Sequence, residues 1–176
     1  MFRRLMISLP VLLAAFGGPT MAMTISSPVF NDGGEIPSRF TCEADDISPP
    51  LVFAGIPAGA KSLVLIVDDP DAPDPAAPKM TWVHWLVFNL QPDTGGLPEA
   101  LEALPGGAEA GLNDWHRADY GGPCPPIGRH RYFFKLYALD ARLTDLEQPN
   151  KPALLRAMQD HVLAEAQLMG TYQKQR

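Results

Sequence analysis

The sequence lacks most of the features by which common protein classes are recognised. Its longest apolar run, near the N-terminus, covers about a dozen residues, whereas a membrane-spanning helix needs about 20. Lysine and arginine number 14 against 20 acidic residues, and the resulting formal charge of −6 repels nucleic-acid backbones. Neither an HExxH zinc pattern nor a serine in a GxSxG elbow is present. These absences argue against a membrane-spanning protein, a nucleic-acid binder and the familiar hydrolases.

The first 22 residues are typical of a secretory signal peptide. Arg3 and Arg4 precede the apolar stretch 5–16, and small residues follow up to Ala22. We expect cleavage after Ala22, which would change the formal net charge from −6 to −8 because both arginines are removed. Residues 23–176 contain no repeat or linker and are expected to form a single domain of a periplasmic or secreted protein.

Cysteine is scarce, since Cys42 and Cys124 are the only two. In an oxidising compartment an even number predicts a disulfide, and closing a loop of this length would stabilise the fold by about 4 kcal/mol on the chain-entropy model. Two separate buried thiols are the alternative. A third possibility is a nucleophilic Cys124 paired with His84 or His130, which would require a free thiol.

Proline and glycine are abundant, with 19 and 15 residues, and they leave little room for long helices. Three apolar runs, 62–67, 83–90 and 131–139, are rich in β-branched, leucine and aromatic residues. Each is too short for a helix and is bounded by turn residues, so each predicts a buried strand. The pattern as a whole favours a mainly β fold.

One helix is expected near the C-terminus. Asn150 can cap it, Pro152 fits its first turn, and apolar residues recur at helical spacing as far as Ala166. His161 would then lie on the helix as a partly buried or solvated side chain. The segment 168–173 would return as a short last strand, which makes a β-α-β crossover.

Four polar side chains stand at the ends of the predicted strands: Asp69, Asp71, His84 and His130. If these ends converge, the four residues form one small pocket that can exchange protons or hold an anion. The rigid loop 120–128 adds backbone donors at Gly122 and Cys124, which suit an oxyanion. The residue types by themselves leave catalysis open, because two imidazoles and a carboxylate are also a catalytic zinc set.

Several short motifs occur in a fixed order around these strand ends. They are Ser48-Pro-Pro-Leu51, Gly55-Ile-Pro-Ala-Gly59, Asp69-Pro-Asp-Ala-Pro73, His84-Trp-Leu-Val-Phe-Asn89, Asn113-Asp-Trp115, Tyr120-Gly-Gly-Pro-Cys-Pro-Pro126, His130-Arg-Tyr132 and Gly170-Thr-Tyr172. Each is weak alone, but the ordered set, from about Ile25 to the C-terminus, resembles the phosphatidylethanolamine-binding protein family. More narrowly, it is similar to the bacterial branch of Raf-kinase-inhibitor-like proteins.

The resemblance implies two packed, mostly antiparallel sheets of Greek-key type with a C-terminal helix. It also implies a small cavity for phosphate, phosphate esters or phospholipid head groups, with no cofactor, metal or catalytic residue. Carried over by position, the ligand-binding residues are Asp69, Asp71, His84, Cys124 through its amide, Pro126, His130 and Tyr132, with Trp82 and Trp85 as walls.

Three functions are compatible with these residues. We expect a non-catalytic binding protein for a small anionic or phosphorylated ligand, able to modulate a protein partner that the sequence does not identify. The second is a metal- or acid/base-dependent hydrolase that uses Asp69, His84 and His130. The third is a protein-interaction or protease-inhibitor module that acts through another surface.

Overall fold

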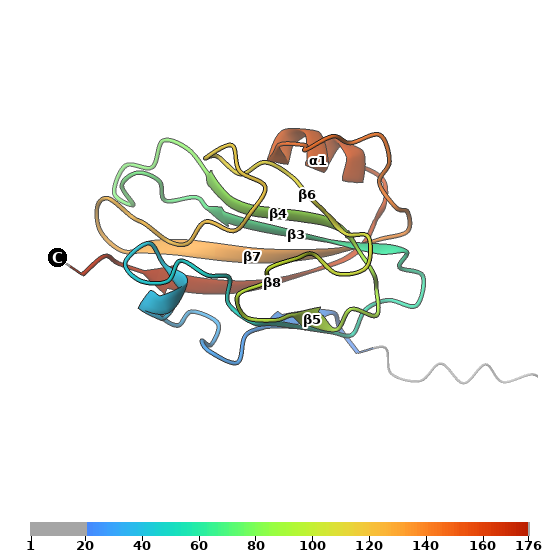
Figure 1. The fold of residues 1–176 in the computed structure, drawn as a ribbon, viewed down its shortest axis with the longest axis horizontal. Helices are drawn as coiled ribbons and strands as arrows, with labels where there is room; N and C mark the ends of the chain where they lie inside the picture. The colour runs from blue at the N-terminus through green and yellow to red at the C-terminus, as the bar shows by residue number, and fades with distance from the viewer. Residues whose placement is uncertain (1–20, 176) are drawn as a thin grey trace, which may run out of the picture.

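The computed structural model describes residues 21–175, so residues 1–20 of the predicted leader lie outside the described part of the chain. The described residues form two antiparallel sheets and one α-helix, which confirms the mainly β prediction (Figure 1). The smaller sheet has the order β1-β2-β5, with β1 at Thr24–Ser26, β2 at Leu51–Ala54 and β5 at Gly96–Leu97. The larger sheet has the order β6-β4-β3-β7-β8, with β6 at Glu109–Ala110, β4 at Trp82–Leu90, β3 at Ser62–Asp69, β7 at His130–Leu139 and β8 at Val162–Tyr172.

The five-stranded sheet is the middle layer of the molecule, between the small sheet and helix α1 (Lys151–Met158) (Figure 1). Strand β3 is buried along its whole length, because its alternate side chains enter two different cores. Leu63, Leu65 and Val67 face the core shared with the small sheet. Val64 and Ile66 face the core that Leu154 and Met158 of α1 complete. Within residues 21–175, no helix has the length and apolar character needed to cross a bilayer.

The three predicted strands are confirmed, and each observed strand extends its predicted run by one or two residues. Strand β4 contains an irregularity that the apolar pattern does not reveal. Val67 of β3 pairs with Trp85, whereas the next residue, Asp68, pairs with Val83. His84 is therefore the extra residue of a β-bulge, a device that re-aims a side chain within a sheet.

The predicted helix begins where the sequence indicates but ends earlier. The Asn150 side chain accepts a hydrogen bond from the Ala153 amide at 3.0 Å, as expected of an N-cap. The helix stops at Met158, and Asp160, with φ of 66°, turns the chain into β8. The prediction of helix as far as Ala166 is wrong because the backbone from Val162 onward pairs with β7 instead.

The connection between β7 and β8 also differs from the predicted crossover. It does contain α1, but the two strands are antiparallel neighbours, with His130 opposite Tyr172 at one end and Leu139 opposite Val162 at the other. Helix α1 therefore lies in the loop that connects two antiparallel neighbouring strands, β7 and β8, and does not form a parallel crossover. His161 lies after the helix, 44% exposed, and its Nδ1 contacts Asp140 Oδ1 at 2.8 Å.

A disulfide joins Cys42 and Cys124, with their Cα atoms 5.4 Å apart. The bond links the segment after the short 3-10 helix Ser38–Phe40 to the loop that precedes β7. This is the predicted pairing, and it leaves Cys124 without the free thiol that a nucleophile would need.

Candidate functional site

The antiparallel register brings three strand ends together at one end of the large sheet. Asp69, the last residue of β3, pairs with Trp82, the first residue of β4. On the other side of β3, Asp68 pairs with Phe133, close to the start of β7 at His130. The chain therefore delivers the polar residues of all three strand ends to a single place, as the sequence predicts.

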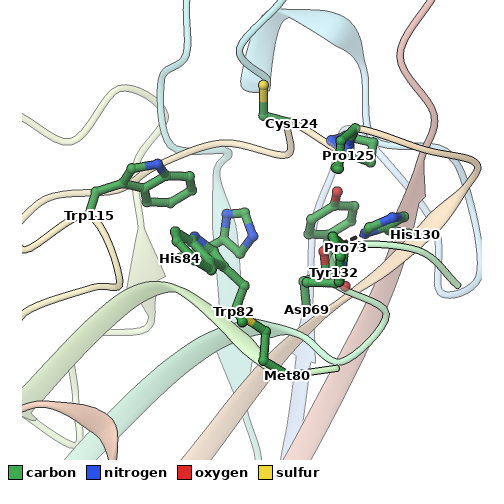
Figure 2. A pocket seen from close by; sticks show the side chains of 12 residues that line it. Asp69, Pro73, Met80, Trp82, His84, Trp115, Cys124, Pro125, His130 and Tyr132 are labelled. Carbon is green, nitrogen blue, oxygen red and sulfur yellow. Dashed lines mark hydrogen bonds and ion pairs between the residues drawn. The ribbon is translucent and has the colours of Figure 1, made fainter. Parts of the chain in front are cut away.

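A cavity of about 390 Å³ lies at this junction. It is lined by Asp69, Ala72, Pro73, Met80, Trp82, His84, Trp115, Cys124, Pro125, Pro126, His130 and Tyr132. Figure 2 shows Trp115, Trp82 and His84 on one side of the space and Tyr132, Pro125 and His130 on the other. Most of the wall is aromatic or proline, with a few polar atoms, which is the usual composition of a small-ligand pocket.

Asp69 and His130 form a buried pair at the base of the cavity. His130 Nδ1 lies 2.7 Å from Asp69 Oδ2, and its Nε2 lies 3.0 Å from the carbonyl oxygen of Ile127. The other carboxyl oxygen of Asp69 accepts the amide of Asp71 at 2.7 Å. Burial raises the pKa of Asp69, and the hydrogen bond from His130 opposes that rise. Both ring nitrogens of His130 thus face oxygen acceptors within the protein.

His84 has a different hydrogen-bonding state. Its Nδ1 lies 2.6 Å from the carbonyl oxygen of Gly121, which can only accept, so Nδ1 carries the proton. Burial lowers the pKa of His84 to about 4, so the ring is neutral at physiological pH. A neutral ring with its proton on Nδ1 has a lone pair on Nε2. Edge-to-face contacts with Trp115 and Tyr132, at centroid distances of 5.1 and 5.2 Å, hold the ring in place.

Two buried donors in the wall have no partner. Within residues 21–175, the only buried side-chain polar atoms without a hydrogen bond are Trp82 Nε1 and the Tyr132 hydroxyl. Both residues line the cavity. Burial raises the pKa of Tyr132 above its ordinary value, so the hydroxyl keeps its proton and can donate it. Leaving a buried donor unsatisfied costs about 1–3 kcal/mol, so both atoms are candidates for a hydrogen bond to a ligand.

The loop 120–128 supplies both carbonyls that hold the histidines, and it is tied firmly to the segment 40–46. Besides the disulfide, the Tyr120 hydroxyl donates to the Phe40 carbonyl at 3.0 Å, and the Cys42 amide donates to the Pro123 carbonyl at 3.2 Å. The sequence predicts that the amide of Gly122 points into the cavity, and this prediction is wrong. The amide instead donates a hydrogen bond to Asp46 Oδ1 at 2.7 Å, because a carboxylate oxygen is a strong acceptor.

Two predicted site residues lie outside the cavity wall. Asp71 receives two side-chain hydrogen bonds from Arg131, at 2.9 and 2.7 Å, and one from its amide at 2.9 Å. The Arg131 guanidinium lowers the pKa of Asp71 and occupies both of its oxygens. Trp85 is 3% exposed in the core between the sheets, where it packs edge-to-face on Tyr120 at 5.6 Å. The other predicted residues, Asp69, Trp82, His84, Cys124, Pro126, His130 and Tyr132, line the cavity, and their binding of a ligand stays a prediction.

The sequence does not predict Trp115, which is the largest unpredicted residue of the cavity wall. The side chain of Asn113, 2% exposed, shapes the turn that presents it, since Oδ1 accepts the amides of Trp115 and Arg117 at 3.0 Å each. An asparagine that bonds the amide two residues ahead is a recognised turn signal. The motif Asn113-Asp-Trp115 carried that signal, although nothing in it indicated where the turn would lie.

No group of three or more histidine, cysteine, aspartate or glutamate side chains is placed to hold a metal ion within the part of the chain that the structure describes.

Comparison with known proteins identifies the family of the chain. The family profile described as "Phosphatidylethanolamine-binding protein" matches residues 26–173. A UPF0098 protein of Methanothermobacter thermautotrophicus is 51% identical over 156 residues, which cover 86% of this chain and 99% of the relative.

Solved structures agree with the sequence relatives. A putative phosphatidylethanolamine-binding protein homologue from Chlamydia trachomatis superimposes with a TM-score of 0.81 at 45% identity, covering 88% of this chain and 99% of that chain. YbcL of E. coli, described as a new member of the mammalian PEBP family, superimposes with a TM-score of 0.78 at 28% identity, covering 88% and 100%. The chain therefore belongs to the phosphatidylethanolamine-binding protein family.

Proposed function

We propose that the protein is a non-catalytic binding protein whose cavity takes a phosphate ester, such as a phospholipid head group or a free phosphomonoester. The observation that carries the proposal is the pair of buried, unpartnered donors in the wall, Trp82 Nε1 and the Tyr132 hydroxyl. Donors of this kind match the oxygens of an oxyacid ester. The name of the family to which the chain belongs is consistent with such a ligand.

The cavity would bind through hydrogen bonds rather than through a cluster of positive charges. None of its twelve lining residues is lysine or arginine. The wall is mostly aromatic and proline, and hydrogen bonds to a charged oxygen are strongest in such apolar surroundings. The Asp69–His130 pair would hold the base of the cavity in shape, and the neutral ring of His84 would face the ligand.

Titration with phosphoethanolamine and with phenyl phosphate tests this proposal, with tryptophan fluorescence as the readout because Trp82 and Trp115 line the cavity. We expect saturable quenching in the native protein. Replacing Tyr132→Phe should weaken binding about tenfold, which corresponds to about 1.4 kcal/mol for one lost hydrogen bond. Tyr137→Phe, on the same strand but outside the cavity, is the matched control and should bind normally.

Two outcomes would overturn the proposal. One is the absence of saturable binding for both ligands in protein that is shown to be folded by circular dichroism. The other is turnover: phosphorus NMR should recover the ester intact, and stoichiometric or greater release of inorganic phosphate would favour the hydrolase instead.

We also propose that the protein works outside the cytoplasm. The leader-like residues 1–22 and the disulfide are what support this location, because disulfides persist in oxidising compartments. N-terminal sequencing of the protein from its native cell should find a mature chain that starts at Met23 in the extracytoplasmic fraction. An intact Met1 in the cytoplasmic fraction would refute the proposal.

A further inference from the structure

The proton on the His84 ring is placed by the backbone, and this placement limits which ligand the cavity accepts. The Gly121 carbonyl oxygen, 2.6 Å from Nδ1, can only accept, so the single proton of the neutral ring is on Nδ1. Nε2 is consequently an acceptor. Gly121 cannot move away easily, because its own amide donates to the His84 carbonyl at 3.1 Å and the loop is held by the disulfide at Cys124.

The remaining polar groups of the cavity add a second acceptor and no lysine or arginine. Asp69 carries carboxyl oxygens, and its partner His130 uses both ring nitrogens within the protein. Arg131 could have supplied positive charge, but it is bound to Asp71 outside the cavity wall. A fully ionised oxyanion would therefore bring only lone pairs to the lone pair of His84, with no lysine or arginine in the wall to compensate.

One proton on the ligand removes this conflict. An oxyacid ester that keeps an O–H group can donate to His84 Nε2 while its other oxygens accept from the Tyr132 hydroxyl and the Trp82 indole. We propose that His84 is the specificity-determining residue of the cavity, and that it selects the protonated, monoanionic form of a phosphate ester over the dianion and over acceptor-only anions such as sulfate esters. This inference rests on the proposed function and defines the chemical form of its ligand.

The pH dependence of this preference should come from the ligand, because the groups around His84 keep its ring neutral. Asp69, His130 and Tyr132 line the cavity with His84, and the charges of Asp68, on the other face of β3, and of His130 act on its pKa. Asp46 and Arg117 line a smaller hollow beside Gly121. Arg117 and Asp119 are paired at the surface, with side chains 49% and 64% exposed. Burial keeps the pKa of His84 at about 4, so this ring does not change charge near neutrality. The second ionisation of a phosphomonoester, at about pH 6, is then the ionisation that should control binding.

A ligand series separates ionisation of the ligand from ionisation of the protein. Phenyl phosphate should bind about tenfold more weakly for each pH unit above its second pKa. Benzylphosphonate and its α,α-difluoro analogue differ in that pKa, so the midpoint of their affinity profiles should shift with the ligand. Phenyl sulfate, which has no O–H group at any of these pH values, should bind at least tenfold more weakly than the phenyl phosphate monoanion.

A variant tests the role of the ring nitrogen directly. His84→Asn keeps a donor near the Nδ1 position for the Gly121 carbonyl and removes the Nε2 acceptor. We expect it to bind the phenyl phosphate monoanion about tenfold more weakly and to lose its preference over phenyl sulfate. His116→Asn, at an exposed position in the loop that carries Trp115, is the matched control and should keep the native preference. The melting temperature of each variant shows whether it is folded, and the ligand series on the native protein decides the question if His84→Asn is not.

The outcomes distinguish this inference from the function on which it rests. Binding of phenyl phosphate that strengthens as it becomes a dianion, or equal binding of phenyl sulfate, would overturn the selection by His84 and leave the proposed function standing. Affinity midpoints that coincide for the two phosphonates would overturn it as well, because they would place the titrating group in the protein. Absence of binding for the whole series at every pH would instead refute the proposed function.

Discussion

Asp68 and Asp69 are neighbours in the chain, yet they serve opposite faces of the large sheet. Asp68 is fully buried on the helix side, where its carboxylate accepts hydrogen bonds from Lys135 Nζ at 2.8 and 2.9 Å and from Lys151 Nζ at 2.5 Å. Asp69 points to the cavity side and pairs with His130 at 2.7 Å. Strand alternation alone sends two identical side chains into two different environments.

The two faces differ in how completely their polar groups are satisfied. On the helix side, Asp68 is matched by two cations and fastens the first turn of α1 to β7, which is a structural role. On the cavity side, two buried donors are left without partners, and the histidines are held by loop carbonyls. Unsatisfied buried groups are costly and rare, so this difference supports the proposal that the cavity face binds a ligand, whereas the helix face contributes to stability.

The largest expected effect comes from releasing the loop on the cavity side. The double variant Cys42→Ser with Cys124→Ser removes a bond between residues 82 positions apart, and it should lower the free energy of unfolding by about 4 kcal/mol. Guanidinium denaturation without reductant measures this change, and the native protein under reductant should behave like the variant. A loss below about 1 kcal/mol would mean that the hydrogen bonds to Phe40 and Asp46 are sufficient to hold the loop.

Breaking the pair on the helix side should affect stability without affecting the cavity. Asp68→Ala leaves Lys135 and Lys151 without their shared partner, and the free energy of unfolding should fall by about 3 kcal/mol. The expected value is at the low end for a buried pair, since the lysine side chains remain 28% and 20% exposed. Ligand affinity should stay within twofold. Asp93→Ala, at an exposed position, is the control and should change stability by less than about 0.5 kcal/mol. A large loss of affinity in Asp68→Ala would show that the two faces are coupled.

Acid should destabilise the cavity side through His84. The pKa of His84 in the folded protein is about 4, against 6.5 for an unperturbed histidine, so between these values only the unfolded chain binds the proton. Stability is therefore complete above pH 6.5, falls as the pH decreases toward 4, and levels off below that. At pH 4.5 the contribution should be on the order of 2 kcal/mol. The raised pKa of Asp69 acts in the opposite direction, so the measurement is the difference in unfolding free energy between the native protein and His84→Asn across this range. If the unfolding free energies of the two proteins changed in parallel with pH, the lowered pKa of His84 would be contradicted.

The smallest effect on stability should come from Asp69→Asn. In contrast to Asp68→Ala, this variant should lose ligand affinity rather than stability. The amide oxygen can still accept one hydrogen bond, so the free energy of unfolding should fall by only about 1 kcal/mol. Affinity for phenyl phosphate should fall at least tenfold, because the His130 ring loses its carboxylate and its fixed orientation. Isothermal titration calorimetry measures the affinity. An Asn variant that binds as well as the native protein would limit Asp69 to a structural role.

Much of the fold could be predicted because the decisive patterns are local. The runs that became β3, β4 and β7 are short, apolar and bounded by turn residues, and burial on both faces requires such sequences. Asn150 and Pro152 mark the start of α1 by their own chemistry. The end of α1 was missed because Val162 and Ala166 fit a helical stripe equally well. Only the presence of β7 alongside decided that they belong to a strand.

The sequence predicted which residues line the site better than it predicted how they are arranged. Asp69, His84 and His130 are recognisable as polar residues at strand ends, and the family resemblance added Tyr132 and the proline wall. Asp71 was included as a second aspartate at the end of the strand and by the family resemblance, but the Arg131 side chain binds both of its carboxyl oxygens. Trp115 was missed because the turn that carries it is far from His84 in the sequence and reaches it only in the folded chain.

The sequence by itself determined the strands β3, β4 and β7, the start of the helix and the family, since each depends on residue type and order. It favoured a disulfide, and the structure shows that bond. The tertiary structure alone decided which aspartate faces the cavity, which nitrogen of His84 holds the proton, and which donors are left unpaired. The physical reason is that these properties depend on contacts between residues distant in sequence. The bulge at His84 and the carbonyls of the loop 120–128 meet only when the sheet has formed.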